Sequence, residues 1–354
     1  MKKSFLIVCI LIGIMFLTLN SFSVQANKKS PSDWKISTPE EQGMDAKILS
    51  GSDGAVKTDF EAVTSLLVVR HGYLVYEKYY QGKNKDNYTH VFSVTKSVVS
   101  ALTGIAIEEK FLKGIDQKIS EFYPGYLKGA NSKKRDISIK NMLTMTAGLE
   151  PTDKIFYAWE GSSDWFEYAL NRPLVSNPGE KFGYNTGLTH LLGGVIAKSA
   201  KMDIKKFADQ YLFGPLGITH YKWNRDPKGN FGGGHLLNLT PRDMAKFGYL
   251  YLKGGKWQSK QVVPEKWVKE STRVQADPGD GRKYGYLWWL DKKRDKVHQK
   301  EFAIFSAIGY GGQYITVIPE LDIVVVITCD ANHFLNKGDA TNQLMVDYVI
   351  PAVR

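Results

Sequence analysis

The sequence contains two Ser-x-x-Lys tetrapeptides, a spacing that can bring a lysine amine to a serine hydroxyl. The first, Ser32-Asp-Trp-Lys35, lies in polar sequence beside Pro31 and precedes no apolar helix, so we regard it as chance. The second, Ser93-Val-Thr-Lys96, opens a segment whose apolar residues recur at helical spacing. A three-residue step on a helix places two side chains on one face. Ser93 and Lys96 are therefore a candidate nucleophile and its base.

The start of a helix suits this chemistry. Backbone N–H groups and the helix dipole stabilise an anion at that end. The same positive end, together with burial, disfavours a protonated lysine, so the Lys96 amine can act as a base. On this tetrapeptide alone, the alternative is a capping serine followed by an ordinary surface lysine.

Other signatures of catalysis or ligand binding are absent from the sequence. There is no G-x-S-x-G elbow, no H-E-x-x-H or paired-cysteine spacing for zinc, and no G-x-x-x-x-G-K-[ST] loop. The glycine cluster Gly229-Asn-Phe-Gly-Gly-Gly234 lacks the preceding strand that a nucleotide cradle requires, and we interpret it as a turn. We expect no metal and no cofactor.

The elements that must position these residues follow a simple order along the chain. A short helix is predicted near residues 39–49, and a hairpin joined at His71-Gly72 follows it. Helical and loop sequence dominates from Ser93 to about residue 215. Thr240-Pro-Arg-Asp243 has the cap, proline and acid that begin another helix. Strands are predicted at residues 63–70, 73–80, 284–290, 313–318 and 321–328, and a last helix at about 342–349.

This order predicts an α/β fold of the α+β type. An antiparallel sheet would be built from both ends of the chain and flanked by helices. A helical subdomain, about residues 97–215, would be inserted between the two halves of the sheet. The whole of residues 27–354 would form one catalytic domain.

Six segments, in the same order along the chain, resemble the class C-related branch of the serine β-lactamase and penicillin-binding-protein superfamily. They are Val91-Phe-Ser-Val-Thr-Lys-Ser97, residues 137–149, Pro178-Gly-Glu-Lys-Phe-Gly-Tyr-Asn-Thr186, residues 212–218, residues 239–243 and Gly309-Tyr-Gly-Gly-Gln313. The resemblance runs from about residue 37 to the C-terminus. It implies a β-lactamase/DD-peptidase-like fold with Ser93 in a groove between the two parts.

The resemblance also implies roles for individual residues. Ser93 would be the nucleophile and Lys96 its hydrogen-bonded partner. Tyr184 would share a proton with Lys96, as general base in acylation and general acid toward the leaving group. A tyrosine can do this only if nearby cations lower its pKa, and Lys96 is the natural cation.

Two departures from the family pattern bear on the substrate. The usual Tyr-x-Asn box is Tyr184-Asn185-Thr186 here, and a threonine offers a substrate amide only one donor. The usual Lys-Thr-Gly or His-Thr-Gly box is absent, and Tyr310-Gly311-Gly312 stands in its place. An ungapped reading would move this box to about residues 304–306. The oxyanion hole would combine the N–H of Ser93 with one from this strand, expected at Gln313.

The missing cation should weaken the binding of the penicillin carboxylate, so the sequence favours an esterase or amidase over a dedicated β-lactamase. The substrate would be a small molecule or derive from peptidoglycan: a β-lactam, a D-alanyl peptide or ester, or a small ester or amide. The rival hypotheses are a penicillin-recognition or wall-binding module that acylates slowly or not at all, and a basic wall scaffold. Aromatic residues that would wall the cleft or, as we favour, fill the core are Phe156, Tyr157, Trp159, Trp165, Phe166, Trp288 and Trp289.

The N-terminus reads as a secretory signal. Lys2 and Lys3 precede an apolar run, and Val24-Gln-Ala26 offers a cleavage site, so residues 1–26 are the predicted signal peptide. An uncleaved membrane anchor is the alternative. Cleavage would lower the net charge from +11 to +9 and leave Cys329 as the single cysteine. We expect a secreted or cell-envelope protein that associates with the anionic cell wall and binds no nucleic acid.

Overall fold

Strands from the two ends of the chain pair with each other in one sheet. β2 (Val63–Arg70) lies between β3 (Tyr73–Tyr79) and β13 (Ile323–Cys329) and is antiparallel to both. The other strands of this sheet are β1 (Lys35–Ile36), β9 (Lys283–Tyr284), β10 (Trp289–Arg294), β11 (Glu301–Gly309) and β12 (Gln313–Ile318). Within the described residues the order of its eight strands is β1-β3-β2-β13-β12-β11-β10-β9. This arrangement confirms the predicted fold class.

The computed structural model describes residues 34–295, 297, 299–333 and 343–354, which lie in the compact unit Ser32–Arg354. The predicted signal peptide, residues 1–26, lies outside the described residues. Within these ranges, no helix combines the length and the apolar character needed to cross a membrane.

Most helices lie between β3 and β9 along the chain. The helices are α1 (Ala46–Thr58), α2 (Val94–Glu108), α3 (Ile119–Phe122), α4 (Ser132–Arg135), α5 (Ile139–Leu143), α6 (Phe156–Glu160), α7 (Trp165–Asn171), α8 (Thr186–Ala200), α9 (Ile204–Ala208), α10 (Pro241–Leu252) and α11 (Glu265–Ser271). Short 3₁₀ helices are η1 (Glu40–Gln42), η2 (Thr152–Ile155) and η4 (Pro319–Leu321), and short π-helices are η3 (Asp209–Phe213) and η5 (Met345–Val349). Small sheets pair β4 (Thr89–His90) and β5 (Lys222–Trp223) with β6 (Leu237–Leu239), and β7 (Lys256–Trp257) with β8 (Lys260–Gln261).

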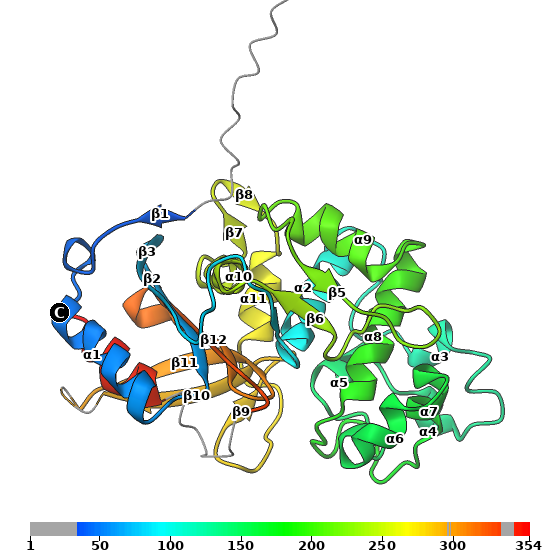
Figure 1. The fold of residues 1–354 in the computed structure, drawn as a ribbon. Coiled ribbons are helices and arrows are strands. Elements are labelled where there is room, and N and C mark those ends of the chain that lie inside the picture. Colours follow the sequence, from blue (N-terminus) through cyan, green and yellow to red (C-terminus); the bar gives the residue numbers. More distant parts are fainter. Residues whose placement is uncertain (1–33, 296, 298, 334–342) are drawn as a thin grey trace, which may run out of the picture. The chain divides into compact units, whose positions relative to one another are not determined.

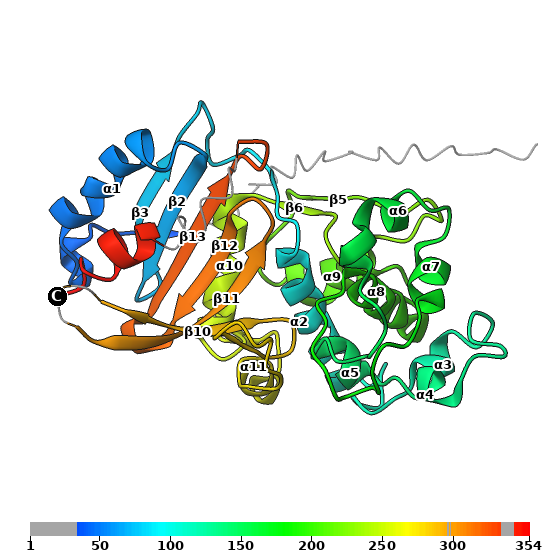
Figure 2. The ribbon, with the colours of Figure 1, turned by 90° about the horizontal axis from the view of Figure 1, so that it is seen from below.

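Both faces of the sheet are covered, which explains why β2 is buried at every position. Leu66 and Val68 belong to a core cluster with residues of α1 and η5, whereas Leu67 and Val69 belong to a second cluster with residues of α2 and α10. Successive side chains of a strand point to opposite faces, so each face of β2 supplies one cluster. Figures 1 and 2 show α1 on one face of the sheet and α10 on the other.

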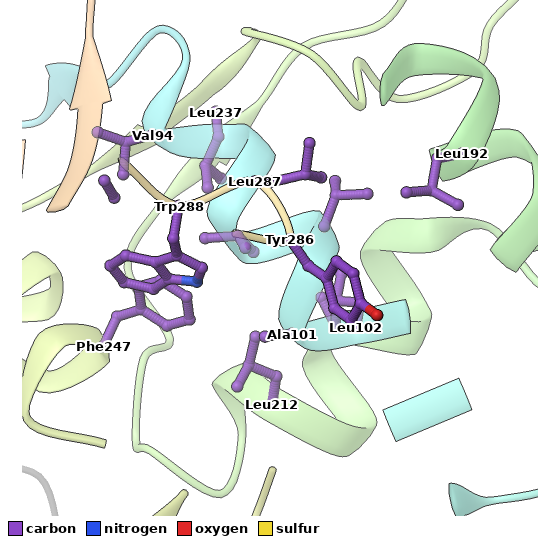
Figure 3. Close-up of a cluster of buried hydrophobic side chains, with 14 of the residues drawn as sticks. Val94, Ala101, Leu102, Leu192, Leu212, Leu237, Phe247, Tyr286, Leu287 and Trp288 are labelled. Carbon is purple, nitrogen blue, oxygen red and sulfur yellow. The ribbon is translucent and has the colours of Figure 1, made fainter. Parts of the chain in front are cut away.

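Helix α2 joins the sheet to the helical part of the chain. Its residues from Val94 to Ala106 are all buried, polar ones such as Lys96 and Ser100 included, so the helix is enclosed on all sides. Figure 3 shows Val94, Ala101 and Leu102 of α2 among side chains from other elements, including Leu192, Phe247 and Trp288. Because α2 is enclosed, the residue at its N-terminus is held in a fixed place.

Several predicted elements have different bounds. The predicted helix at residues 39–49 is a short turn, η1, that ends at Gly43 in the left-handed region; α1 then begins after its cap, Asp45. The predicted strand 284–290 is broken, because Leu287 has a left-handed φ of 62° and donates its N–H to Leu143. This break packs Tyr286 and Leu287 near α2 (Figure 3).

Two strands qualify the prediction further. No strand is predicted at β11, although the buried apolar residues Phe302 and Ile304 alternate with exposed ones as in a strand. β1 pairs with β3 in parallel, so the sheet is mixed and not purely antiparallel. The cap that was predicted for α10 is present, since the Thr240 side chain accepts a hydrogen bond from the Asp243 N–H.

Candidate active site

Ser93 is the N-terminal capping residue of α2, yet its hydroxyl caps nothing. Its side chain makes no capping hydrogen bond, so Oγ is available for other contacts. The residue before it, Phe92, has a left-handed φ of 46°, which a non-glycine residue adopts at an energetic cost. The Phe92 ring is stacked on His90 and lies edge-on to Tyr310. The backbone thus turns sharply just before the candidate nucleophile.

Lys96 is buried, with 1% of its surface exposed, and its amine has three partners. Nζ lies 2.7 Å from Ser93 Oγ, 3.0 Å from Thr186 Oγ1 and 2.9 Å from the carbonyl oxygen of Gly234. Burial lowers the pKa of Lys96 to about 8, and the nearby Asp153 carboxylate partly opposes this change. The neutral form of the amine, which a base requires, is therefore more populated near neutral pH than in an ordinary lysine.

Tyr184 contacts both Ser93 and Lys96. The Ser93 side chain hydrogen-bonds to its phenol, and Lys96 Nζ lies 4.9 Å from the centre of its ring. Burial raises the pKa of Tyr184 well above its ordinary value; the bond from Ser93 and the charge of Arg282 oppose this. This direction is opposite to the sequence expectation, because the phenol is desolvated more strongly than the nearby cations can offset. Trp289 stacks on the ring, at 5.8 Å between centroids.

Thr186 and Asp153 form a second contact to Lys96. The Asp153 carboxylate accepts hydrogen bonds from the Thr186 N–H at 2.5 Å and from the Thr186 hydroxyl at 2.7 Å. Thr152 Oγ1 accepts from the Gly187 N–H at 2.9 Å. These bonds satisfy the first N–H groups of α8, whose capping residue Asn185 makes no side-chain cap. Asp153 was not singled out in the sequence, where no local pattern marks it.

The glycine cluster is more than a turn. The turn at residues 226–229 includes only Gly229 of the predicted range 229–234, and Gly233 and Gly234 run against α8. A Cβ at Gly234 would lie 2.5 Å from Thr186 Cγ2 and 2.8 Å from the Thr186 carbonyl oxygen. Only a glycine therefore lets the Gly234 carbonyl reach Lys96. Consecutive glycines were the available signal for this close approach.

A buried pair anchors the same loop. His190 Nε2, on α8, lies 3.0 Å from Asp226 Oδ2, and both side chains are almost fully buried. The Gly233 N–H donates to His190 Nδ1, so the histidine proton is on Nε2 and points to Asp226. Next to Gly234, His235 contacts Glu160 at 3.0 Å. Burial lowers the pKa of His235, while Glu160 opposes that shift.

The predicted third box meets the segment before Ser93. A Cβ at Gly309 would clash with the Val91 carbonyl oxygen, and the Tyr310 ring lies 5.5 Å from that of Phe92. Tyr310 is exposed, and Gly311 and Gly312 have left-handed φ values. By contrast, in the alternative register Ile304 packs in the core near α1, and Ser306 hydrogen-bonds to Thr316.

The Gln313 side chain is hydrogen-bonded to the backbone of neighbouring segments. Its amide donates to the carbonyl oxygens of Gly311 and Cys329, so the side chain is engaged within the fold. Gln313 and Phe92 also line a polar cavity of about 410 Å³, whose walls do not include Ser93 or Lys96. This cavity is separate from the group of side chains around Lys96.

The aromatic residues flagged in the sequence divide between core and cleft. Trp159, Trp165, Phe166 and Trp288 are buried in the core, as favoured above. Trp289 is partly exposed and stacks on Tyr184, and the guanidinium of Arg282 lies 3.9 Å from its ring centre. Tyr157 is exposed and has no part in the site. Across the described residues, no cluster of three or more His, Cys, Asp or Glu side chains is arranged to hold a metal ion.

Comparisons with known proteins agree with this geometry. A family model described as Beta-lactamase matches residues 55–349. An uncharacterized protein of Alkalihalophilus pseudofirmus is 22% identical over 74% of this chain and 82% of its own length. Protein flp of Staphylococcus aureus is 26% identical over 50% of this chain but only 38% of its own length.

Solved structures share the fold. A provisionally named 6-aminohexanoate-dimer hydrolase from Bacillus anthracis superposes with a TM-score of 0.71 at 21% identity, over 84% of this chain and 80% of its own. A penicillin binding protein from Bacillus halodurans superposes with a TM-score of 0.66 at 14% identity, over 85% of this chain and 98% of its own. A class C beta-lactamase in complex with cefoxitin superposes with a TM-score of 0.64 at 16% identity, over 86% of this chain and 98% of its own.

Proposed function

Because this chain belongs to the beta-lactamase family, which includes penicillin-binding-protein-like serine hydrolases, we propose that it hydrolyses a carboxylic ester or amide through an acyl-enzyme on Ser93. The observation that carries the proposal is the 2.7 Å contact between Ser93 Oγ and the buried amine of Lys96. A hydroxyl next to a neutral amine is an activated nucleophile.

The proposed reaction begins when Ser93 Oγ attacks the substrate carbonyl carbon and its proton passes to Lys96. The Tyr184 phenol hydrogen-bonds with Ser93 and lies over Lys96, so it is suited to relay that proton to the leaving group. Collapse of the tetrahedral intermediate breaks the ester or amide bond. Water then attacks the acyl-enzyme, and Ser93 regains its proton.

The negative charge that develops on the carbonyl oxygen needs hydrogen-bond donors. The Ser93 N–H lies at the start of α2 and donates to no residue in the described part of the chain. We propose that it forms the oxyanion hole with a backbone N–H of the Gly309–Gln313 segment, for which Gln313 is the predicted residue.

The substrate class follows from what surrounds these groups. The Tyr310-Gly311-Gly312 segment carries no cation where the family pattern has one, which supports a small ester or amide over a penicillin. Relatives are named for different chemistries, including a D-alanyl-D-alanine carboxypeptidase assignment in Salmonella enteritidis and the 6-aminohexanoate-dimer hydrolase. A D-alanyl peptide or ester from peptidoglycan therefore stays among the proposed substrates.

We also propose that the protein acts outside the cytoplasm. The signal-like residues 1–26 and the net charge of +11 support export and association with an anionic cell wall. Mass analysis of the protein from the medium and the envelope would test this, with cleavage after Ala26 expected.

Intact mass spectrometry with a fluorophosphonate tests the reaction. The reagent phosphorylates an activated serine with loss of fluoride, so one adduct is expected, and none in Ser93→Ala. A parallel sample with benzylpenicillin separates the subclasses: a lasting adduct indicates a penicillin-binding protein, and hydrolysed drug without an adduct indicates a β-lactamase. Labelling by the phosphonate alone would favour the esterase or amidase. No adduct and no turnover with either reagent would refute the proposal and favour a binding module.

A further inference from the structure

Lys96 has more hydrogen-bond partners than a neutral amine has protons to give. A neutral lysine carries two N–H groups and one lone pair. Its partners are the Gly234 carbonyl, which can only accept, and two hydroxyls, Ser93 and Thr186, each of which can donate or accept. To act as a base toward Ser93, the amine must direct its lone pair to Ser93 and both protons elsewhere.

Asp153 determines which of its hydroxyl partners the Lys96 amine donates to. An ionised carboxylate accepts hydrogen bonds and donates none. The single proton of the Thr186 hydroxyl is therefore directed to Asp153 Oδ1, at 2.7 Å. Thr186 Oγ1 then has only lone pairs to offer Lys96 at 3.0 Å. With Thr186 and the Gly234 carbonyl both acting as acceptors, the two N–H groups of Lys96 are used and its lone pair faces Ser93.

We infer that Asp153 is a positioning residue of this site, which acts through the Thr186 hydroxyl to orient the lone pair of Lys96 toward Ser93. The inference rests on the proposed function of Ser93 and Lys96. In this arrangement Thr186 positions the Lys96 amine, whereas the sequence suggests that it contacts the substrate. Thr186 is buried and its one proton is already engaged, so it holds the amine in place.

The charge of Asp153 has a second effect, which provides a separate readout. Its carboxylate raises the pKa of Lys96 against the larger lowering by burial. Other ionisable groups around Lys96 are Tyr184, whose pKa burial raises, and His235, whose pKa burial lowers. Glu160 faces His235, and Arg282 acts on Tyr184 from beyond Trp289. The Asp153 charge raises the pKa of Lys96, and the Lys96 charge in turn lowers the pKa of His235.

The test is the rate of fluorophosphonate labelling of Ser93 as a function of pH, in a set of variants. Asp153→Asn introduces an amide N–H toward Thr186, so the threonine proton can turn to the Lys96 lone pair and compete with Ser93. We expect the maximal rate to fall on the order of 10- to 100-fold, and the acidic limb of the profile to move to lower pH. Asp164→Asn is the matched control. Asp164 likewise accepts backbone N–H bonds at a helix start, two of them at α7, and it hydrogen-bonds to none of Ser93, Lys96 and Thr186.

A double-mutant cycle separates this role from a merely structural one. Thr186→Val removes the hydroxyl through which Asp153 acts, and Thr186→Ser keeps it. We expect Thr186→Ser to label faster than Thr186→Val, because it keeps the hydroxyl. In the Thr186→Val background, Asp153→Asn should cost little further. An equal loss of rate in both backgrounds, or an acidic limb that does not move, would overturn the inference.

Folding of each variant is checked by circular dichroism. If Asp153→Asn does not fold, Asp153→Ala with added formate replaces it, since a small carboxylate can fill the vacated position. Recovery of the rate by formate in Asp153→Ala, but not in the Asp153→Ala and Thr186→Val double variant, supports the inference; no recovery counts against it. If the parent protein itself is not labelled, the proposed function has failed, and that result is distinct from failure of the inference.

Discussion

The carbonyl oxygen of Gly234 lies 2.9 Å from the Nζ atom of Lys96, 138 residues away along the chain. This bond takes one proton of the amine and ties the loop before β6 to the start of α2. It depends on a backbone that runs directly against α8, where Gly233 and Gly234 leave no room for a side chain. The position of the Lys96 amine is thus set by three separate parts of the chain: α2, α8 and this loop.

Gly234→Ala should slow the chemistry more than it lowers stability. Its Cβ would lie 2.5 Å from Thr186 Cγ2, so the loop must move outward and the bond from Lys96 lengthens. A displacement of about 1 Å near reacting groups can cost on the order of 100-fold in rate. We expect a loss of that size in the rate of fluorophosphonate labelling. Gly125→Ala, which has open space around the position of its Cβ, should label at the parental rate; equal rates in the two variants would contradict this prediction.

The sequence predicted the parts of the site that lie within one element. Ser93 and Lys96 are three residues apart on a helix, and the observed contact of 2.7 Å is what that spacing implies. The fold class followed from the order of strands and helices, because strands from both ends had to find partners. Tyr184 was found through family resemblance and not by any local pattern.

The rest of the site depends on contacts that no local pattern encodes. Asp153 and Thr186 are 33 residues apart, and only the packing of η2 on α8 brings them together. The glycine cluster was interpreted as a turn because turns and close approaches use the same residue type. The direction of the Tyr184 pKa shift also required the structure, since it depends on how far burial outweighs the nearby cations.

Lys96 should set the acidic limb of the rate profile. The neutral amine is the active form and its pKa is about 8, so the labelling rate should rise with pH through this value and then level off. Lys96→Arg keeps a positive charge at every accessible pH and cannot act as a base. We expect its rate to fall by about 100-fold or more, with no limb near pH 8. Labelling rates measured from pH 6 to pH 10, roughly the range between the ordinary pKa values of histidine and lysine, check both points. A parent profile that is flat over this range would exclude Lys96 as the titrating base.

Tyr184→Phe removes the phenol but keeps the ring that stacks on Trp289. If the phenol relays a proton, turnover of an alkyl ester such as ethyl acetate, whose alkoxide leaving group needs that proton, should fall by about 100- to 10,000-fold. Labelling by a fluorophosphonate should fall less, because fluoride leaves without needing a proton. The ratio of the two losses is the measurement. Phe182→Leu, which alters a neighbouring ring but no phenol, is the control and should change both rates by similar small factors. Equal losses in Tyr184→Phe would indicate that the phenol has no role toward the leaving group.

The buried pair of His190 and Asp226 should control both stability and rate. Asp226 accepts hydrogen bonds from His190 and from the backbone and side chain of Asn230. An asparagine amide cannot accept at its nitrogen, so Asp226→Asn leaves buried donors unpaired and should lower the free energy of unfolding by about 2–5 kcal/mol. Because the pair anchors the loop that carries Gly234, the labelling rate should fall as well.

The pH dependence of stability provides an independent check on this pair. Burial alone would raise the pKa of Asp226, but its bonds from His190 and Asn230 hold that pKa below the ordinary value. The unfolded carboxyl therefore takes up a proton first as the pH falls, and the stability from this pair is lost through the folded-state pKa. Burial also lowers the pKa of His190, which adds a loss of stability below its ordinary value of 6.5. Below the ordinary aspartate pKa of 3.8, thermal unfolding should thus be less steeply pH-dependent in Asp226→Asn than in the parent, because the variant lacks this carboxyl. The exposed residue Asp86, paired with Lys85 on the surface, is the control: Asp86→Asn should change neither the stability nor its pH dependence, and an effect as large as that of Asp226→Asn would argue against a special role for the buried pair.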